Sequence, residues 1–277
     1  MTAWLFAHLQ FYAVLGALAA MAVWESFRPL RKPVGSTARR WIDNAILATL
    51  GSGLARLCLP LAGIACAQFA QARGLGLLNL FDVPPWLAFA ITVLALDLGH
   101  YATHRLVHAV PLLWRIHKIH HADLHVDCAT AVRHHPLDTL LAASIDLLVI
   151  AALGATPLGV LAASTLTLAV AAFSHANVSL GAKLDAVLRR VVVTPAMHVV
   201  HHSSEHDEAN SNYTVLFSWW DRWFGTWKEA PRLGLSRLRV GIAEARHPEE
   251  VALVRSLAMP FRRERRSAVS PVLGPRT

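Results

Sequence analysis

The stretch DLGHYATHRLVHAVPLLWRIHKIHH, residues 97–121, runs from the end of an apolar segment into a dense series of histidines. His100 and His104 are four residues apart, so on a helix both rings project from one face and could hold a single ion. The end of the stretch has the same geometry, with three histidines at positions i, i+3 and i+4: His117, His120 and His121. One such group is weak evidence, because histidines at helical spacing are often simply exposed.

Histidines in similar spacings recur further along the chain. MHVVHH at 197–202 repeats the HxxHH spacing, and the short motifs RHHP at 133–136 and SHAN at 174–177 contain three more histidines. The chain has 16 histidines in 277 residues, and so many in these patterns would be improbable without a metal. The sequence therefore predicts a metal site formed by His100, His104, His117, His120, His121, one histidine of RHHP, His175, His198, His201 and His202.

The composition indicates an all-α integral membrane protein. Hydrophobic residues make up 55% of the chain, charged residues only 16%, and the mean hydropathy is +0.41. The apolar segment 4–24 contains no acid or base and is long enough to cross a hydrocarbon layer of roughly 30 Å. No Lys or Arg precedes this segment, so we expect a retained helix rather than a cleaved signal peptide.

Three further apolar regions complete the predicted membrane stem. A second span covers 42–70, although Arg56 and Pro60 interrupt it, and a third begins at Trp86 and ends in the first histidine pair. The block 139–173 would measure about 52 Å as one helix, so a turn at 154–157 is expected to fold it into a hairpin. We predict about four transmembrane helices, hairpin included, and a cytosolic helical cap that carries the histidines.

The positive charges predict the orientation. Five Lys and Arg cluster in 28–40, which marks this loop as cytoplasmic, whereas 71–85 contains one Arg. This orientation brings all the histidine motifs to the cytoplasmic side of what we expect to be a bacterial inner membrane. It also explains the net charge of +8 without nucleic acid, for which no binding motif is present. We predict one domain, residues 1–257, followed by a basic mobile tail, residues 258–277.

The ligand types favour iron over zinc. The three cysteines are isolated and form no CxxC, which structural zinc sites commonly use. Ten imidazoles exceed the need of one ion and suit two, each with about five nitrogen ligands and an open position. A zinc hydrolase is the next option, but neither HExxH nor GxSxG is present.

The motifs DLGHYATHR, LWRIHKIHH, RHHP, SHAN, PAMHVVHH and WWDRWFGTW together resemble the fatty acid hydroxylase/sterol desaturase superfamily over residues 97–227. The resemblance implies a membrane-bound di-iron oxygenase that uses O2 and two electrons to hydroxylate or desaturate a lipid. It maps the ten predicted histidines onto ligand positions, with His135, the histidine directly before the proline, as the ligand from RHHP. Zinc is a possible substitute in purified protein. Where the family often has NYG after the last histidine motif, this chain has Asn212, Tyr213 and Thr214.

The substrate and the electron donor are expected to be separate molecules. Lipid would enter laterally from the membrane, and sterol, hopanoid, carotenoid, fatty acyl and alkyl-ether lipids are all compatible with the motifs. The chain has no nucleotide-binding GxGxxG and no haem-attachment CxxCH. We therefore expect a ferredoxin or cytochrome-type donor to dock on the basic cytosolic face.

Two polar residues beside the histidine motifs are candidates for a catalytic supporting role. Asp97 precedes His100 by one helical turn and could orient a ligand ring by accepting its second N–H. Asn177 follows His175 and could hold a ligand or a water, although capping a loop is the ordinary role for such a residue. The remaining histidines are assigned interfacial or solvated roles, with His134 able to exchange with His135: His8, His108, His125, His134, His206 and His247.

Two other classes of protein remain open. A non-catalytic metal-binding protein or metal transporter would also need many histidines, but a transporter usually places its ligands near the membrane midplane between repeated halves. A zinc-dependent membrane hydrolase on the same scaffold is the second alternative. Metal analysis would separate both from the oxygenase.

Overall fold

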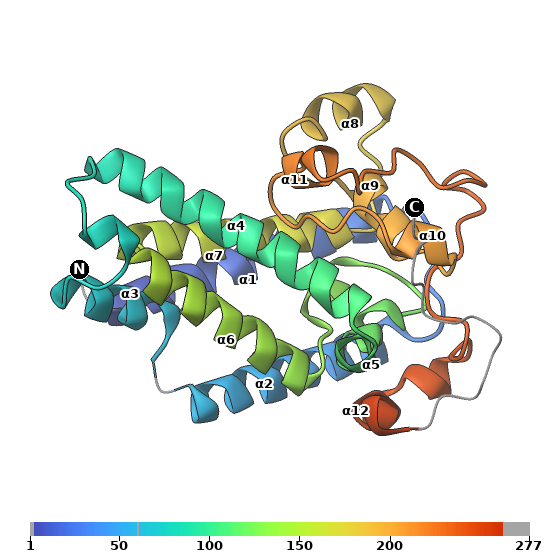
Figure 1. Cartoon of the computed structure of the whole chain (residues 1–277). Helices are drawn as coiled ribbons and strands as arrows, with labels where there is room; N and C mark the ends of the chain where they lie inside the picture. The colour runs from blue at the N-terminus through green and yellow to red at the C-terminus, as the bar shows by residue number, and fades with distance from the viewer. Residues whose placement is uncertain (1–2, 60, 263–277) are drawn as a thin grey trace, which may run out of the picture.

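The structure is a computed structural model that describes residues 3–59 and 61–262. Its described part is helical and forms no β-strand, which confirms the all-α prediction. Five segments of this part are long and apolar enough to cross a membrane. The long helices lie side by side in one bundle, and most of the shorter helices gather at one end of it, whereas α3 lies at the other end (Figure 1).

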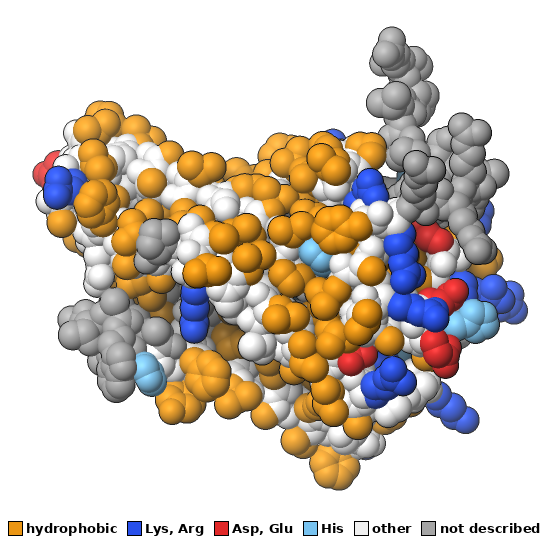
Figure 2. All heavy atoms as spheres, turned by 90° about the horizontal axis from the view of Figure 1, so that it is seen from below, with side chains coloured by type: hydrophobic (Ala, Val, Ile, Leu, Met, Phe, Trp, Pro, Cys, Tyr) orange, Lys and Arg blue, Asp and Glu red, His pale blue; other side chains and the backbone are white. Residues whose placement is uncertain are grey.

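The bundle is built from five long helices, which pack in the pairs α2 with α6, α1 with α7, and α4 with both α6 and α7. Their bounds are α1 (Ala3–Phe27), α2 (Thr37–Cys58), α4 (Pro85–Ala109), α6 (Pro136–Leu153) and α7 (Pro157–His175). Large apolar side chains on this bundle point outward, for example Leu57 at 83% and Leu148 at 69% exposed. Figure 2 shows the resulting surface, which is largely hydrophobic.

The second predicted span is not one helix. α2 ends at Cys58, and α3 (Gly63–Ala72) starts a separate short helix, followed by the 3-10 turn η1 (Leu77–Asn79). Proline at position 60 explains the break, because its ring cannot continue a helix. Arg56 therefore lies in the last turn of α2, near the end of the bundle, where a cation is less costly than at its centre.

The predicted hairpin is confirmed. α6 ends at Leu153 and is capped by Gly154, which adopts a left-handed conformation with φ 67°, and α7 starts at Pro157 after the Thr156 cap. A side chain at Gly154 would come within 2.7 Å of the Leu75 carbonyl oxygen, so glycine is required here. The hairpin returns the chain to the end of the bundle at which it entered.

The cap consists of short helices and loops at the end of α4 where the histidines cluster (Figure 1). Its elements are α5 (Pro111–His121), η2 (Cys128–Val132), α8 (Ala182–Leu188), α9 (Pro195–His201), α10 (His206–Ala209), α11 (Trp219–Trp223), η3 (Pro248–Val251), α12 (Leu253–Ala258) and η4 (Met259–Phe261).

Buried polar contacts fix the cap to the bundle. The Arg133 guanidinium is buried and donates to the Ile119 carbonyl, the Asn44 side chain and the Val251 carbonyl, which joins α5, α2 and η3. Glu25 at the end of α1 accepts from the backbone N–H groups of Cys128 and Asn177. These bonds hold the segments that follow α5 and α7 against the bundle.

The first residues of the predicted tail, 258–261, belong to α12 and η4 of the cap. Ala258 ends α12, and η4 packs against α5, where the Arg115 side chain donates to the Arg262 carbonyl. The rest of the predicted tail, 263–277, lies outside the described residues.

Candidate metal centre

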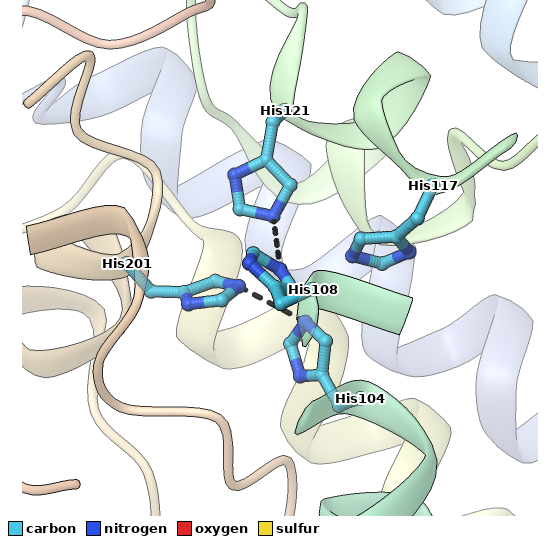
Figure 3. A group of neighbouring side chains, drawn as sticks. All are labelled: His104, His108, His117, His121 and His201. Carbon is cyan, nitrogen blue, oxygen red and sulfur yellow. Dashed lines mark hydrogen bonds between the residues drawn. The ribbon is translucent and has the colours of Figure 1, made fainter. Parts of the chain in front are cut away.

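Five histidines from three helices, α4, α5 and α9, converge at the end of α4 (Figure 3). One nitrogen of each ring lies within 4.8 Å of the others, close to the spacing of ligands around one ion. We call these residues the five-histidine group: His104, His108, His117, His121 and His201. The Nε2 atoms of His104 and His201 are 2.9 Å apart, and those of His108 and His121 are 3.1 Å apart.

A second set of four buried histidines lies beside the first, and we call it the four-histidine group: His120, His175, His198 and His202. The His175 Nε2 atom is 3.0 Å from that of His198 and 3.2 Å from those of His120 and His202. The stacked rings of His121 and His202, with centroids 4.8 Å apart, connect the two groups.

Each HxxHH motif contributes to both groups rather than to one. His121 belongs to the five-histidine group and its neighbour His120 to the other, and His201 and His202 divide in the same way. Adjacent residues on a helix project about 100° apart, so an HH pair cannot easily serve one ion but can serve two that lie side by side. Each HH pair therefore supplies one histidine to each of the two groups.

Hydrogen bonds to carbonyl oxygens fix the tautomer of several rings. The Nδ1 atoms of His104, His201 and His175 lie 2.7 Å from the carbonyl oxygens of Tyr213, Ser211 and Ala171, respectively. A carbonyl oxygen can only accept, so each Nδ1 carries the proton and each neutral ring has a bare lone pair on Nε2. The Nε2 lone pairs of His104 and His201 then face each other at 2.9 Å and repel. A cation bound by both nitrogens would remove this repulsion.

The four-histidine group has the same requirement for a cation. The Nε2 atoms of His175, His198 and His202 are mutually 3.0 to 3.2 Å apart. Each neutral nitrogen is either a donor or an acceptor, so at least two of the three are of the same kind and cannot bond to each other. A metal ion accepts all three lone pairs, so the residues present fit a metal at both groups.

Burial keeps the rings in the form that binds metal. Burial, reinforced by neighbouring histidines, lowers the pKa values of His120, His121, His198, His201 and His202 well below the ordinary histidine value. These rings therefore stay neutral, with lone pairs available, at pH values where a solvated histidine is partly protonated.

Two of the ten predicted ligands lie outside both groups. The His100 ring points to α6, where its Nε2 is 3.1 Å from Asp146. The His135 side chain caps α6 by accepting from the Leu137 N–H, and its other nitrogen is 3.3 Å from the Leu257 carbonyl. The structure brings the other eight predicted histidines together.

Two histidines that the sequence patterns assign to ordinary roles lie at the centre. His108 belongs to the five-histidine group, and the His134 ring stacks on His120 with centroids 4.5 Å apart. His104 and His108 form a second HxxxH pair that overlaps the first, so the spacing contained the signal but could not distinguish the two pairs. In RHHP, the backbone conformation at the start of α6 turns His134 toward the two groups and His135 away from them, and the motif alone does not determine this choice.

Asp138 connects these histidines on the side of α6. Its Oδ2 accepts from His117 Nδ1 at 3.1 Å and from His134 Nδ1 at 2.9 Å. The bond to His117 leaves the Nε2 of that ring free to bind a cation. Asp138 thus takes the orienting role that the sequence suggested for Asp97.

The two predicted supporting residues have other contacts. Asp97 Oδ2 accepts from the Trp220 indole at 2.7 Å and from the Phe217 N–H, so it fixes α11 to α4. Asn177 exchanges hydrogen bonds with the backbone of Arg31 through both ends of its amide. Neither contacts a ring of the two groups in the described structure, and Asn177 has the loop-holding role expected by default.

A short loop, 211–214, supplies two of the carbonyls that orient ligand rings. Asn212 holds it in place with φ 51° and with bonds from its amide to the Met197 and Lys228 carbonyls. The buried Asp221 carboxylate accepts from the backbone N–H groups of Tyr213 and Thr214. The threonine that replaces the glycine of NYG also donates its hydroxyl to Asp221, so this departure adds a contact to the loop.

The fold and the site together define a class: a helical protein with membrane-length apolar helices and two adjacent histidine groups that could each hold a metal ion. Residues 89–226 match the family model for fatty acid hydroxylase. The chain belongs to this family, as its histidine motifs indicated.

The curated relatives are lipid hydroxylases and monooxygenases. The ornithine lipid hydroxylase OlsE of Rhizobium tropici is 30% identical over 174 residues, 62% of this chain and 50% of the relative. The alkylglycerol monooxygenase of Homo sapiens is 29% identical over 159 residues, 54% of this chain and 33% of the relative. The cholesterol 25-hydroxylase of Mus musculus is 29% identical over 143 residues, 51% of this chain and 47% of the relative. The chain thus spans half or less of these relatives, and no solved structure matches it significantly.

Proposed function

We propose that this protein is a membrane-bound di-iron oxygenase that hydroxylates a lipid, using O2 and electrons from a separate protein. The observation that carries the proposal is the convergence of nine imidazoles, seven of them buried, in two adjacent groups, several with their Nε2 lone pair fixed toward a neighbouring ring. The names of the relatives favour hydroxylation over desaturation.

The proposed ligands are the members of the five-histidine and four-histidine groups, one group for each ion. Two bound iron ions would supply the oxidising power to break an unactivated C–H bond, which no amino-acid side chain can provide. Asp138 and the carbonyls of Tyr213, Ser211, Ala171 and Arg133 hold the rings in position. Burial of the rings excludes water that would compete with the substrate.

Lipid can approach from the apolar surface around the bundle. Next to α5, which carries three of the proposed ligands, is a hollow of about 390 Å³ lined by Leu112, Leu113, Arg115, Ile116, Leu137, Pro260 and Phe261. Its apolar walls suit an acyl chain, and its place beside the ligand-bearing helix favours access for lipid over access for a water-soluble substrate.

The electron donor is proposed to dock on the cap. Exposed cations on this side include Arg190, Arg232, Arg237 and Arg239, which would attract an acidic ferredoxin or cytochrome-type protein. Turnover by isolated membranes with NAD(P)H alone, without any added donor, would contradict a separate donor.

The proposal is tested by metal analysis and lipid profiling. Purified protein should hold two irons per chain, and lipid extracts from cells with the gene should contain a species with one additional oxygen by mass spectrometry. A species lacking two hydrogens would indicate desaturation instead. Zinc with O2-independent activity would favour the hydrolase, and metal without any lipid change would favour the binding or transport alternative.

Variants at the centre provide the control for this experiment. His120→Ala and His201→Ala should each abolish the lipid product while the protein still inserts, because each removes a proposed ligand. His8→Ala, near the start of α1 and outside both groups, should leave the product level unchanged. Equal product from all three variants would refute the assignment.

A further inference from the structure

We propose that His100 and Asp146 form a binding site inside the membrane bundle for an uncharged lipid that carries a hydroxyl group. His100 lies on α4 and Asp146 on α6, and the His100 Nε2 is 3.1 Å from Asp146 Oδ1 and 3.3 Å from Oδ2. This inference names the substrate class for the proposed function, and it depends on that function only for the reaction, because binding itself needs no metal.

The depth of the pair makes it unusual. His100 precedes His104 by four residues, so it lies about 6 Å further into the bundle along α4. Asp146 is near the middle of α6, a helix of 18 residues that is a candidate membrane span. An ionisable pair at this depth is costly in a lipid environment, and such groups usually mark a functional site.

The carboxylate of Asp146 is not fully used by its partner. One His100 N–H can satisfy only one of the two oxygens, although both are within reach. The Asp146 side chain is 36% exposed, whereas that of His100 is 19% exposed. A pair that served only to hold α4 to α6 would gain from burying both partners, so the partly exposed carboxylate points to a ligand from the membrane.

Further polar atoms on α4 and on α7 are buried without hydrogen-bond partners among the described residues. Asp97 Oδ1 and His100 Nδ1 on α4 are buried and make no hydrogen bond within the described part of the chain. Thr165 Oγ1 and Thr167 Oγ1 on α7, which packs against α4, are also buried without a hydrogen bond in the described part of the chain. Polar atoms in such numbers suit a ligand with a small polar group better than a purely apolar chain.

The chemistry of the pair selects the ligand. A carboxylate oxygen only accepts hydrogen bonds, so the ligand must donate one. A large charged headgroup would stay at the membrane surface because of its desolvation cost, whereas a single hydroxyl can be drawn to this depth. A lipid held by its hydroxyl at Asp146 would place carbons only a few bonds away near the histidine groups, so we expect oxidation close to that hydroxyl.

The test uses two photoactivatable probes on the full chain in lipid nanodiscs: a long-chain alcohol and its methyl ether, which lacks the donor. The alcohol should label peptides of α4 and α6 about ten-fold more strongly than the ether, the factor supplied by one hydrogen bond to a charged group. Equal labelling by the two probes would overturn the proposal, and this comparison needs no variant.

Variants then assign the site. Asp146→Leu should reduce labelling by the alcohol to the level of the ether, whereas Asp146→Asn, which keeps an acceptor, should retain part of the difference. Ser144→Ala is the matched control, because the Ser144 hydroxyl lies on the same helix and bonds only to the Leu140 carbonyl in its own turn. Labelling of Asp146→Leu at the level of the unmodified protein would overturn the proposal.

The double change His100→Leu with Asp146→Leu covers the case in which a single change disturbs assembly, since it leaves no unpaired partner. It should bind both probes equally and keep its metal. Selective labelling by the alcohol in the double variant would overturn the assignment. Because labelling requires no turnover, a chain that binds the alcohol but oxidises no lipid would contradict the proposed function and leave this inference intact.

Discussion

Individual histidines in this chain differ in what their ring nitrogens contact. Four members of the two groups donate from Nδ1 to a backbone carbonyl, which fixes the ring and leaves Nε2 bare: His104, His120, His175 and His201. His100 instead directs Nε2 to a carboxylate on another helix. The same residue type therefore favours a metal in one place and hydrogen bonding in another.

This difference predicts the metal content of two variants about two turns apart on α4. His108→Ala should lose metal, because the ring belongs to the five-histidine group, whereas His100→Ala should keep both ions. Mass spectrometry of metal per chain after purification in detergent measures both. If His100→Ala lost metal and His108→Ala did not, the ligands on α4 would be His100 and His104, the first HxxxH pair.

Removing the carboxylate that orients His117 should be less severe than removing a ring. Asp138→Asn keeps the size of the side chain but weakens the bonds to His117 and His134. We expect a loss of about 10- to 100-fold in metal affinity or activity, which is typical when the group behind a ligand is changed. A competition assay with a chelator measures the affinity, and Asp138→Glu provides a variant that keeps the charge.

Among the elements, α11 has its own attachment to the bundle. Trp220 donates to Asp97 from a buried position, so this short helix is fixed to the middle of α4. The loop 211–214, which orients His104 and His201, is held by Asp221 in the same helix. The position of α11 therefore determines the geometry of ligands that are far away in sequence.

Breaking this attachment should reduce stability. Trp220→Phe removes the indole N–H and leaves Asp97 with one donor fewer, which should lower the free energy of unfolding by about 1.5–3 kcal/mol. Trp223→Phe, on the same helix but 67% exposed, is the control and should have little effect. Thermal unfolding in detergent compares the two; equal midpoints would show that the bond contributes little.

At the scale of the whole molecule, burial of so many neutral histidines makes stability depend on pH. The pKa values of five rings in the cap are lowered, so between the folded value and about 6.5 the unfolded chain binds more protons than the folded chain. Stability should therefore fall as pH decreases below about 6.5, by about 1.4 kcal/mol per pH unit for each ring that stays neutral. Unfolding of chelator-treated protein at several pH values tests this, and His201→Asn should give a shallower slope.

The orientation of the molecule in the membrane can be tested with a native cysteine. Cys58 is exposed and ends α2, at the far end of the bundle from the histidines, while Cys66 and Cys128 are buried. If the histidines face the cytoplasm, a membrane-impermeant maleimide should label Cys58 in intact cells. Labelling only after the membrane is opened would place the histidine groups on the outer side.

Periodicity and composition sufficed for much of this architecture. Apolar length predicted the membrane helices, and glycine and proline at 154–157 predicted the hairpin turn, because these features depend on local chemistry. Seven of the histidines that the structure brings together were found from HxxxH and HxxHH spacing, which is a local property of a helix, and His175 was found from the SHAN motif. The break after Cys58 was signalled by Pro60, but its consequence, a separate α3, depended on packing against α6 and α7.

The sequence by itself determined that the protein has long apolar helices and a concentration of histidines at one end of them, since both follow from the order of residue types along the chain. Only the tertiary structure decided which of three histidines spaced by four residues on α4 enter a group, and that each HH pair divides between two groups. The physical reason is that a ligand set requires nitrogens within a few ångströms of one another, and those distances arise from the packing of α4, α5, α7 and α9. Spacing within any one helix leaves that packing undetermined.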